Sequence, residues 1–168
     1  MKHTLFLLLL IGIVLPIQSQ DYQKISKAKV SFVFVDKDVD GTISGFTSSS
    51  KIDVNEIESS SFSGSVSVET IKTGNVLRDW SIKGGKYFDA KNHPYIKFSS
   101  TKVVQEGNTI QVTGDLTIKG TTKVEVFEFT RNEKQWIGTC SLNSYDYGIA
   151  IKKKRVDNTV AVKIELFL

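Results

Sequence analysis

The stretch Ile110-Gln111-Val112-Thr113-Gly114-Asp115-Leu116-Thr117-Ile118 decides the fold class. Apolar residues or glycine alternate in it with polar residues, and successive side chains of a β-strand point to opposite faces of a sheet. The same period recurs in five other segments, at residues 30–35, 62–69, 96–99, 136–142 and 160–166. An antiparallel sheet with one apolar and one solvated face produces this pattern. The sequence therefore predicts an all-β domain.

Turn-forming residues separate these segments. The turn signals are Asp40-Gly41, Gly84-Gly85, Glu106-Gly107-Asn108, Lys119-Gly120 and Asp157-Asn158. Six to eight short strands at this spacing predict a sandwich or a barrel. One short helix is expected over residues 75–82, with Val76, Leu77 and Trp80 on its apolar side and Ile82 as a further candidate.

Residues 1–19 have the composition of a secretory signal peptide. Lys2 precedes an apolar run from Leu5 to Val14, and the small polar stretch Gln18-Ser19-Gln20 follows. The run is shorter than the roughly 20 residues that a membrane-spanning helix needs. We therefore expect export to the periplasm or the extracellular space, and one mature domain over residues 20–168.

Few residues could carry catalysis in the mature chain. His93 is its only histidine and Cys140 its only cysteine, so a histidine-rich zinc site and an intramolecular disulfide are excluded. The sequence has no nucleophile-elbow, P-loop or dinucleotide-binding motif. The net charge of +4 is spread along the chain, without the aromatic and basic interleaving that nucleic-acid binding favours. We expect a protein that is not an enzyme, needs no cofactor and binds no nucleic acid.

One segment resembles a calcium-binding loop. Asp36, Asp38, Asp40 and Gly41 match its first, third, fifth and sixth positions. The twelfth position, which normally holds a bidentate Glu, is Thr47. Aspartate and glycine also favour turns without any ion. The three aspartates are therefore a weak candidate for a calcium site.

The inward faces of the predicted strands combine aromatic residues with glycine. Phe32, Phe34, Phe62 and Phe98 have this parity, as does Gly114. Glycine within a strand lets a sheet bend or lets another group approach its backbone. The pattern suits either a curved, filled core or a barrel that holds an apolar ligand, and periodicity does not separate the two.

Several motifs, in order, resemble the YceI-like family of secreted, lipocalin-like lipid-binding proteins. They span residues 29–166 and include Thr73-Gly74-Asn75-Val76-Leu77-Arg78-Asp79, Tyr87-Phe88-Asp89, His93-Pro94 with Ile96 and Phe98, Gly114-Asp115-Leu116-Thr117-Ile118-Lys119-Gly120, and Asp146-Tyr147-Gly148-Ile149. The resemblance implies an antiparallel eight-stranded lipocalin-like barrel with a short capping helix. It also implies binding of a polyisoprenoid or another long-chain lipid in an apolar interior.

Parity and this resemblance together predict a set of lipid-binding residues. The expected cavity wall and cap comprise Phe32, Phe34, Phe62, Val66, Val68, Trp80, Phe88, Phe98, Ile110, Val112, Leu116 and Ile118. Arg78 is the candidate for the lipid head group, because guanidinium matches phosphate geometry. An alternative role for Arg78 and Asp79 is to pin the helix to the barrel end.

Two departures from the family pattern bear on the head group. The family often has a histidine near the end of its first strand, where this chain has the aspartate cluster. An arginine commonly stands two residues before the late aspartate, where this chain has Ser144. The basic run Lys152-Lys153-Lys154-Arg155 is a solvated turn or a transient contact with a membrane surface. The alternative function is a solid-core barrel that serves as a structural or protein-interaction module.

Overall fold

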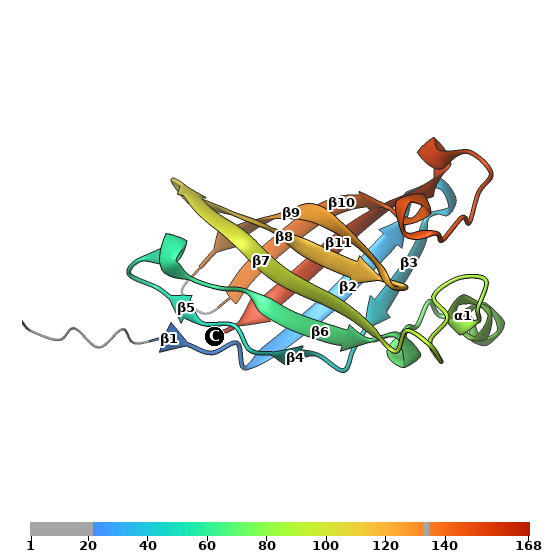
Figure 1. Cartoon of the computed structure of the whole chain (residues 1–168), viewed down its shortest axis with the longest axis horizontal. Coiled ribbons are helices and arrows are strands. Elements are labelled where there is room, and N and C mark those ends of the chain that lie inside the picture. Colours follow the sequence, from blue (N-terminus) through green and yellow to red (C-terminus); the bar gives the residue numbers. More distant parts are fainter. Residues whose placement is uncertain (1–21, 133–134) are drawn as a thin grey trace, which may run out of the picture.

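The computed structural model describes residues 22–132 and 135–168. The predicted signal peptide lies outside these residues. The chain forms a long, curled antiparallel sheet, with the short helix α1 at one end of the long axis (Figure 1). Nine strands follow one another in the order β3-β2-β11-β10-β9-β8-β7-β6-β4. The expected all-β, lipocalin-like architecture with a short helix is thus confirmed.

Each of the six predicted segments overlaps a strand, but the strand over Thr121–Arg131 has no predicted counterpart. The nine strands of the sheet are β2 (Lys27–Phe34), β3 (Val39–Ile43), β4 (Thr47–Ser48), β6 (Ser63–Ser67), β7 (Tyr95–Glu106), β8 (Thr109–Ile118), β9 (Thr121–Arg131), β10 (Gln135–Asn143) and β11 (Thr159–Phe167). A separate two-stranded sheet is formed by β1 (Tyr22–Gln23) and β5 (Ile52–Asp53). The helices are α1 (Val76–Lys83) and the 3-10 turns η1 (Val35–Lys37), η2 (Ile57–Ser59), η3 (Val68–Thr70), η4 (Ser144–Tyr147) and η5 (Arg155–Asn158).

The sheet has nine strands rather than the predicted eight. The two short strands β3 and β4 follow each other in the chain but lie at opposite edges of the sheet. β3 pairs with β2 at one edge, and the chain then continues into β4, which pairs with β6 at the other edge. Between them the backbone N–H of Ser67 donates to the carbonyl of Ser44 at 3.0 Å. The curled sheet is therefore joined across its edges by one bent segment.

One predicted turn differs from the sequence-based expectation. Asp40 and Gly41 do not form a turn but lie within β3, and Asp38, with φ of +50°, provides the turn instead. A Cβ atom at position 41 would lie 2.3 Å from the ring of Phe32, so glycine is required there by close packing. Within the described part of the chain, no helix has the length and apolarity needed to cross a membrane.

The two ends of the barrel are closed differently. At the end away from α1, β5 and η2 place Ile52 and Ile57 against buried Trp136 and Ile110 in one core cluster. At the other end, a second cluster around Ile71 packs below α1 and the segment that follows it. The large residues with inward parity bury Trp136 and Ile110 at the first end, and they leave a larger space towards the second.

Candidate functional site

A cavity of about 540 Å³ lies inside the barrel and extends from the side of α1 as far as Leu166, which pairs with Trp136. Its wall is predominantly apolar and receives side chains from most strands of the sheet. Phe62 and Phe129 stack with their ring centroids 5.8 Å apart, and Trp136 lies 6.0 Å from Phe62. Phe62 and Phe129 line the cavity, whereas Trp136 does not.

Most of the predicted wall residues line this cavity. Those that do are Phe32, Phe34, Phe62, Val66, Phe88, Phe98, Leu116 and Ile118. Val68, Trp80, Ile110 and Val112 do not. The structure thus places eight of the twelve residues on the cavity wall. Their role in lipid binding stays a prediction.

Three of the residues outside the wall are buried elsewhere. Ile110 and Val112 have inward parity, as expected, but they lie in the filled end among Phe127, Phe129 and Trp136. The alternation predicts on which face of the sheet a side chain lies, but it does not predict the position of that side chain along the barrel axis. Val68 belongs to η3 and packs in the second cluster below α1.

Trp80 was expected to face the barrel, and this expectation is wrong. Its side chain is 79% exposed, as are those of Val76 and Leu77 to a similar degree. Ile82 and Arg78 face the cavity instead. The helix forms where predicted, starting after the N-cap Asn75, but Val76, Leu77 and Trp80 of its predicted apolar side point to solvent.

Sequence reasoning missed the part of the wall that comes from the C-terminal half. These residues are Phe127, Phe129, Leu142, Tyr147, Ile149, Val160, Val162, Ile164 and Leu166. Alternation in residues 160–166 and 136–142 already gave five of them inward parity. β9 was harder to interpret, because Val124 and Val126 alternate out of phase with Phe127 and Phe129. The valines point outward, 66% and 42% exposed, and the phenylalanines inward.

Arg78 lines the outer part of the cavity and is anchored through Thr73. Its Nε donates to Thr73 Oγ1 at 2.7 Å, and its Nη2 donates to the Thr73 carbonyl at 2.6 Å. Asp79 Oδ1 accepts from the backbone N–H and hydroxyl of the same threonine. The hydrogen bond from Thr73 holds the pKa of Asp79 below its ordinary value. These contacts pin the helix to the barrel end, and they leave other N–H groups of Arg78 available to a ligand.

Lys37 and Lys97 add two further cations to the cavity wall. Among the residues that the structure describes, the wall contains no aspartate or glutamate. Nearby Asp36 is engaged by Lys152, whose Nζ lies 2.5 Å from Asp36 Oδ2. This hydrogen bond raises the pKa of Lys152. The cavity thus has an apolar body and a cationic outer end.

The proposed calcium loop does not form a ligand cluster. Asp36 is paired with Lys152, Asp38 occupies the turn, and Asp40 lies on β3 opposite Val33. In residues 22–132 and 135–168, no three His, Cys, Asp or Glu side chains are grouped so that they could hold a metal ion. The aspartates therefore serve the turn and the ion pair.

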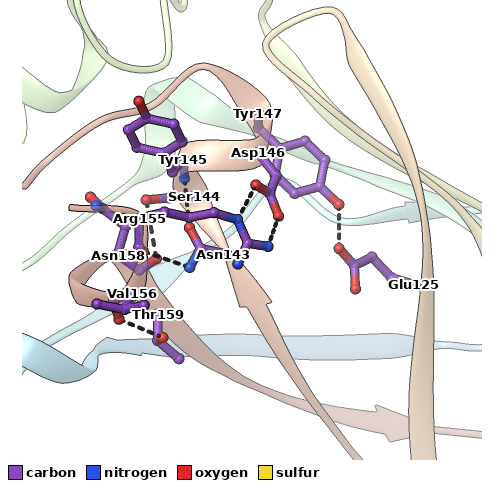
Figure 2. A network of polar contacts seen from close by, with 10 residues as sticks. All are labelled: Glu125, Asn143, Ser144, Tyr145, Asp146, Tyr147, Arg155, Val156, Asn158 and Thr159. Carbon is purple, nitrogen blue, oxygen red and sulfur yellow. Dashed lines mark hydrogen bonds and ion pairs between the residues drawn. The ribbon is translucent and has the colours of Figure 1, made fainter. Parts of the chain in front are cut away.

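The segment between β10 and β11 is held by a polar network at the same end (Figure 2). Asn158 is fully buried, and its side chain accepts from the backbone N–H groups of Ile151 and Lys152 at 2.9 and 2.8 Å. Its amide donates to the carbonyls of Lys152 and Lys154. Arg155 binds Asp146 through two hydrogen bonds, which lower the pKa of that carboxyl.

Ser144 has a structural part in this network. Its hydroxyl donates to the Ile149 carbonyl at 2.9 Å, and it also lines the cavity. The arginine that the family often carries at this position is thus replaced by a small neutral residue. Asp146 obtains an arginine partner from elsewhere in the chain, namely Arg155.

Tyr147 connects the same segment to the barrel wall. Its hydroxyl donates to Glu125 Oε1 at 2.7 Å (Figure 2), and Cys140 Sγ lies 4.0 Å from Glu125 Oε2. Burial, aided by the Glu125 charge, raises the pKa of the Cys140 thiol to about 12. Burial and the hydrogen bond to Glu125 also raise the pKa of Tyr147. Both groups stay protonated at neutral pH, so Cys140 is a poor nucleophile.

A curled antiparallel sheet around an apolar cavity, with a short helix at the outer end, defines a lipocalin-like barrel. His93 is not among the cavity-lining residues, and Cys140 is held as a neutral thiol. The site is suited to holding an apolar molecule.

The chain belongs to the YceI-like domain family, whose model matches residues 22–168. A UPF0312 protein of Pseudomonas putida is 33% identical over 137 residues, which cover 75% of this chain and 68% of that protein. The crystal structure of BcnA from Burkholderia cenocepacia superimposes with a TM-score of 0.75 at 23% identity, covering 86% of this chain and 98% of BcnA. The family predicted from the sequence motifs is confirmed.

A more distant structure carries a functional description. It is a polyisoprenoid binding domain from Saccharophagus degradans, implicated in plant cell wall breakdown. The superposition has a TM-score of 0.57 at 12% identity and covers 87% of this chain and 95% of that domain. At this identity the likeness establishes a shared fold.

Proposed function

We propose that this protein is an exported, non-enzymatic binding protein that sequesters or carries a polyisoprenoid or another long-chain lipid. The observation that carries the proposal is the apolar cavity of about 540 Å³. Small-molecule sites typically enclose about 300–1,000 Å³ and are mostly apolar with a few polar groups. A relative of the same fold is described as a polyisoprenoid binding domain, which supports this class of ligand.

The driving force would be the removal of hydrocarbon from water. Each buried methylene group contributes about 0.8 kcal/mol, so ten of them give roughly 8 kcal/mol before the entropic costs of binding. No reactive group is needed for such binding. The enclosed cavity favours this function over the solid-core alternative.

The polar end of the ligand would lie near Lys37 and Arg78. Both side chains line the cavity, and its described wall has no carboxylate. An anionic head group, such as a phosphate or a carboxylate, would therefore be favoured over a cationic one. Lys37→Gln should weaken binding of an anionic lipid without weakening binding of the corresponding alcohol. Lys102→Gln, on the exposed surface of β7, is the matched control.

A substitution that fills the cavity tests the lipid-binding proposal. Val162 and Ala161 are neighbours on β11, but Val162 lines the cavity whereas Ala161 is exposed. Native mass spectrometry of protein from its own host should reveal a co-purifying lipid, which Val162→Trp loses and Ala161→Trp retains. The folded state is checked by thermal unfolding. Absence of any apolar ligand, together with no change in Tm on adding host lipid extracts, would contradict the proposal.

Export is tested by the mass of the protein from the producing organism. Cleavage after Ser19 predicts a mature chain that begins at Gln20. A full-length chain in the cytoplasmic fraction would contradict export without affecting the proposal for lipid binding.

A further inference from the structure

The outer face of α1 presents three large apolar side chains to solvent. Val76, Leu77 and Trp80 are 82, 80 and 79% exposed. Trp80 lies four residues after Val76 and three after Leu77, so all three share one face of the helix. Contiguous exposed apolar groups of this kind mark interaction sites more often than isolated ones do.

This face lies at the end of the molecule where the cavity has its cationic residues. α1 protrudes at one extremity of the long axis (Figure 1). The same helix supplies Arg78 and Ile82 to the cavity wall. One side of α1 therefore contacts the cavity, and the other side is free to contact a partner.

Positive charge surrounds the apolar face. Residues 68–95 contain five basic residues and three acidic ones. All three carboxylates are engaged within the chain, because Asp79 accepts from Thr73, Asp89 accepts from Asn92, and Glu69 forms an ion pair with Lys83. Lys72, Lys86 and Lys91 are exposed. The loop before η5 adds exposed Lys153 and Lys154 at the same end.

We propose that the outer face of α1 docks on the surface of an anionic phospholipid membrane. An apolar helical face with an exposed tryptophan inserts at the boundary between head groups and acyl chains, and neighbouring lysines bind anionic head groups. Docking in this orientation places the cationic end of the cavity next to the lipid phase. The inference extends the proposed function, since a lipid could then pass between membrane and cavity without crossing bulk water.

The two tryptophans provide a direct readout of docking. Trp80 is exposed, whereas Trp136 is 2% exposed and serves as an internal reference. Vesicles of phosphatidylcholine and phosphatidylglycerol in equal parts should shift the emission of the protein to the blue, and lipids brominated on their acyl chains should quench it. Pure phosphatidylcholine vesicles should give a weaker effect, and added salt should reduce binding to the anionic vesicles. Trp80→Phe should abolish the shift while retaining co-sedimentation with vesicles.

Leu77→Ser should reduce co-sedimentation with the anionic vesicles roughly tenfold, because it removes an apolar anchor. Val124→Ser, an exposed apolar position on β9, should leave it unchanged. Equal binding of Leu77→Ser and the unmodified protein would overturn the inference. So would self-association that Leu77→Ser abolishes without any vesicle binding, since the occupant would then be a second copy. If vesicles are not bound but Val162→Trp still prevents lipid retention, docking fails and the proposed lipid binding stands.

Discussion

The two ends of the barrel are built from the same alternating strands, yet one is solid and the other hollow. Around Trp136, the interior is filled by Ile110, Val112 and the segment from β5 to η2. Towards α1, residues with the same parity, such as Val162 and Ile164, are only half-buried because they border the cavity. The two-residue period therefore determines which side chains point inward. The segment from β5 to η2 determines at which end of the barrel these side chains pack against one another.

The filled end should dominate stability. Trp136→Ala should lower the free energy of unfolding by about 3–5 kcal/mol, because a large buried side chain is lost and the surrounding residues collapse only partly. Denaturant unfolding measures this. Trp80→Ala is the control, and as a change at an exposed site it should alter stability by less than about 0.5 kcal/mol. Equal effects would mean that α1 packs more tightly than its exposure indicates.

Two isoleucines allow a matched comparison of the ends. Ile110 is 1% exposed in the filled end, and Ile164 borders the cavity on β11. Ile110→Ala should cost about 2–5 kcal/mol. Ile164→Ala should cost about 1 kcal/mol, because part of its surface already lacks packing partners. The second variant, not the first, should weaken lipid binding. Similar losses of stability would indicate that the cavity is filled in solution.

The polar network around Asn158 should contribute less to the free energy of unfolding than the buried side chains of Trp136 and Ile110. Asn158→Ala leaves the partly buried backbone N–H groups of Ile151 and Lys152 without their side-chain partner, which should cost about 1 kcal/mol. Hydrogen exchange of these two amides should accelerate more than exchange in β8. Asn108→Ala, in the exposed turn between β7 and β8, should have little effect. Unchanged exchange at Ile151 would show that the loop does not depend on Asn158.

The difference between the two ends also explains what the sequence could predict. Strand parity in residues 30–35 and 160–166 is observed as expected, because burial of one face imposes it. Ile110 and Leu116 share a face, and only the packing of distant segments such as β5 decides that one lies in the core and the other on the cavity wall. No local pattern contains that information.

Two other features escaped prediction for local reasons. The face of α1 that carries Trp80 was assigned to the barrel because apolar residues usually point inward, whereas Thr73 orients the helix through Arg78 and Asp79. In β9, both parities carry apolar residues, so Glu125 and Phe127 could not be placed inward by alternation. Glu125 is accommodated by the hydroxyl of Tyr147, which is distant in sequence.

The smallest expected effect concerns the pH dependence of the α1 anchor. The pKa of Asp79 is lower in the folded protein than its ordinary value of 3.8, because Thr73 donates to the carboxylate. Its stabilising contribution is therefore complete above this value and is lost as the pH falls through the folded pKa. The difference in stability between the unmodified protein and Asp79→Asn should shrink between about pH 5 and pH 2. A difference that is independent of pH would exclude this contribution.

The most direct test of the hollow end is a crystal structure of the protein purified from its own host without removal of lipid. We predict elongated electron density between Phe32, Phe98 and Val162, ending near Arg78, and no such density beside Trp136. A barrel whose own side chains occupy the space between these three residues, with no ligand density, would contradict the account.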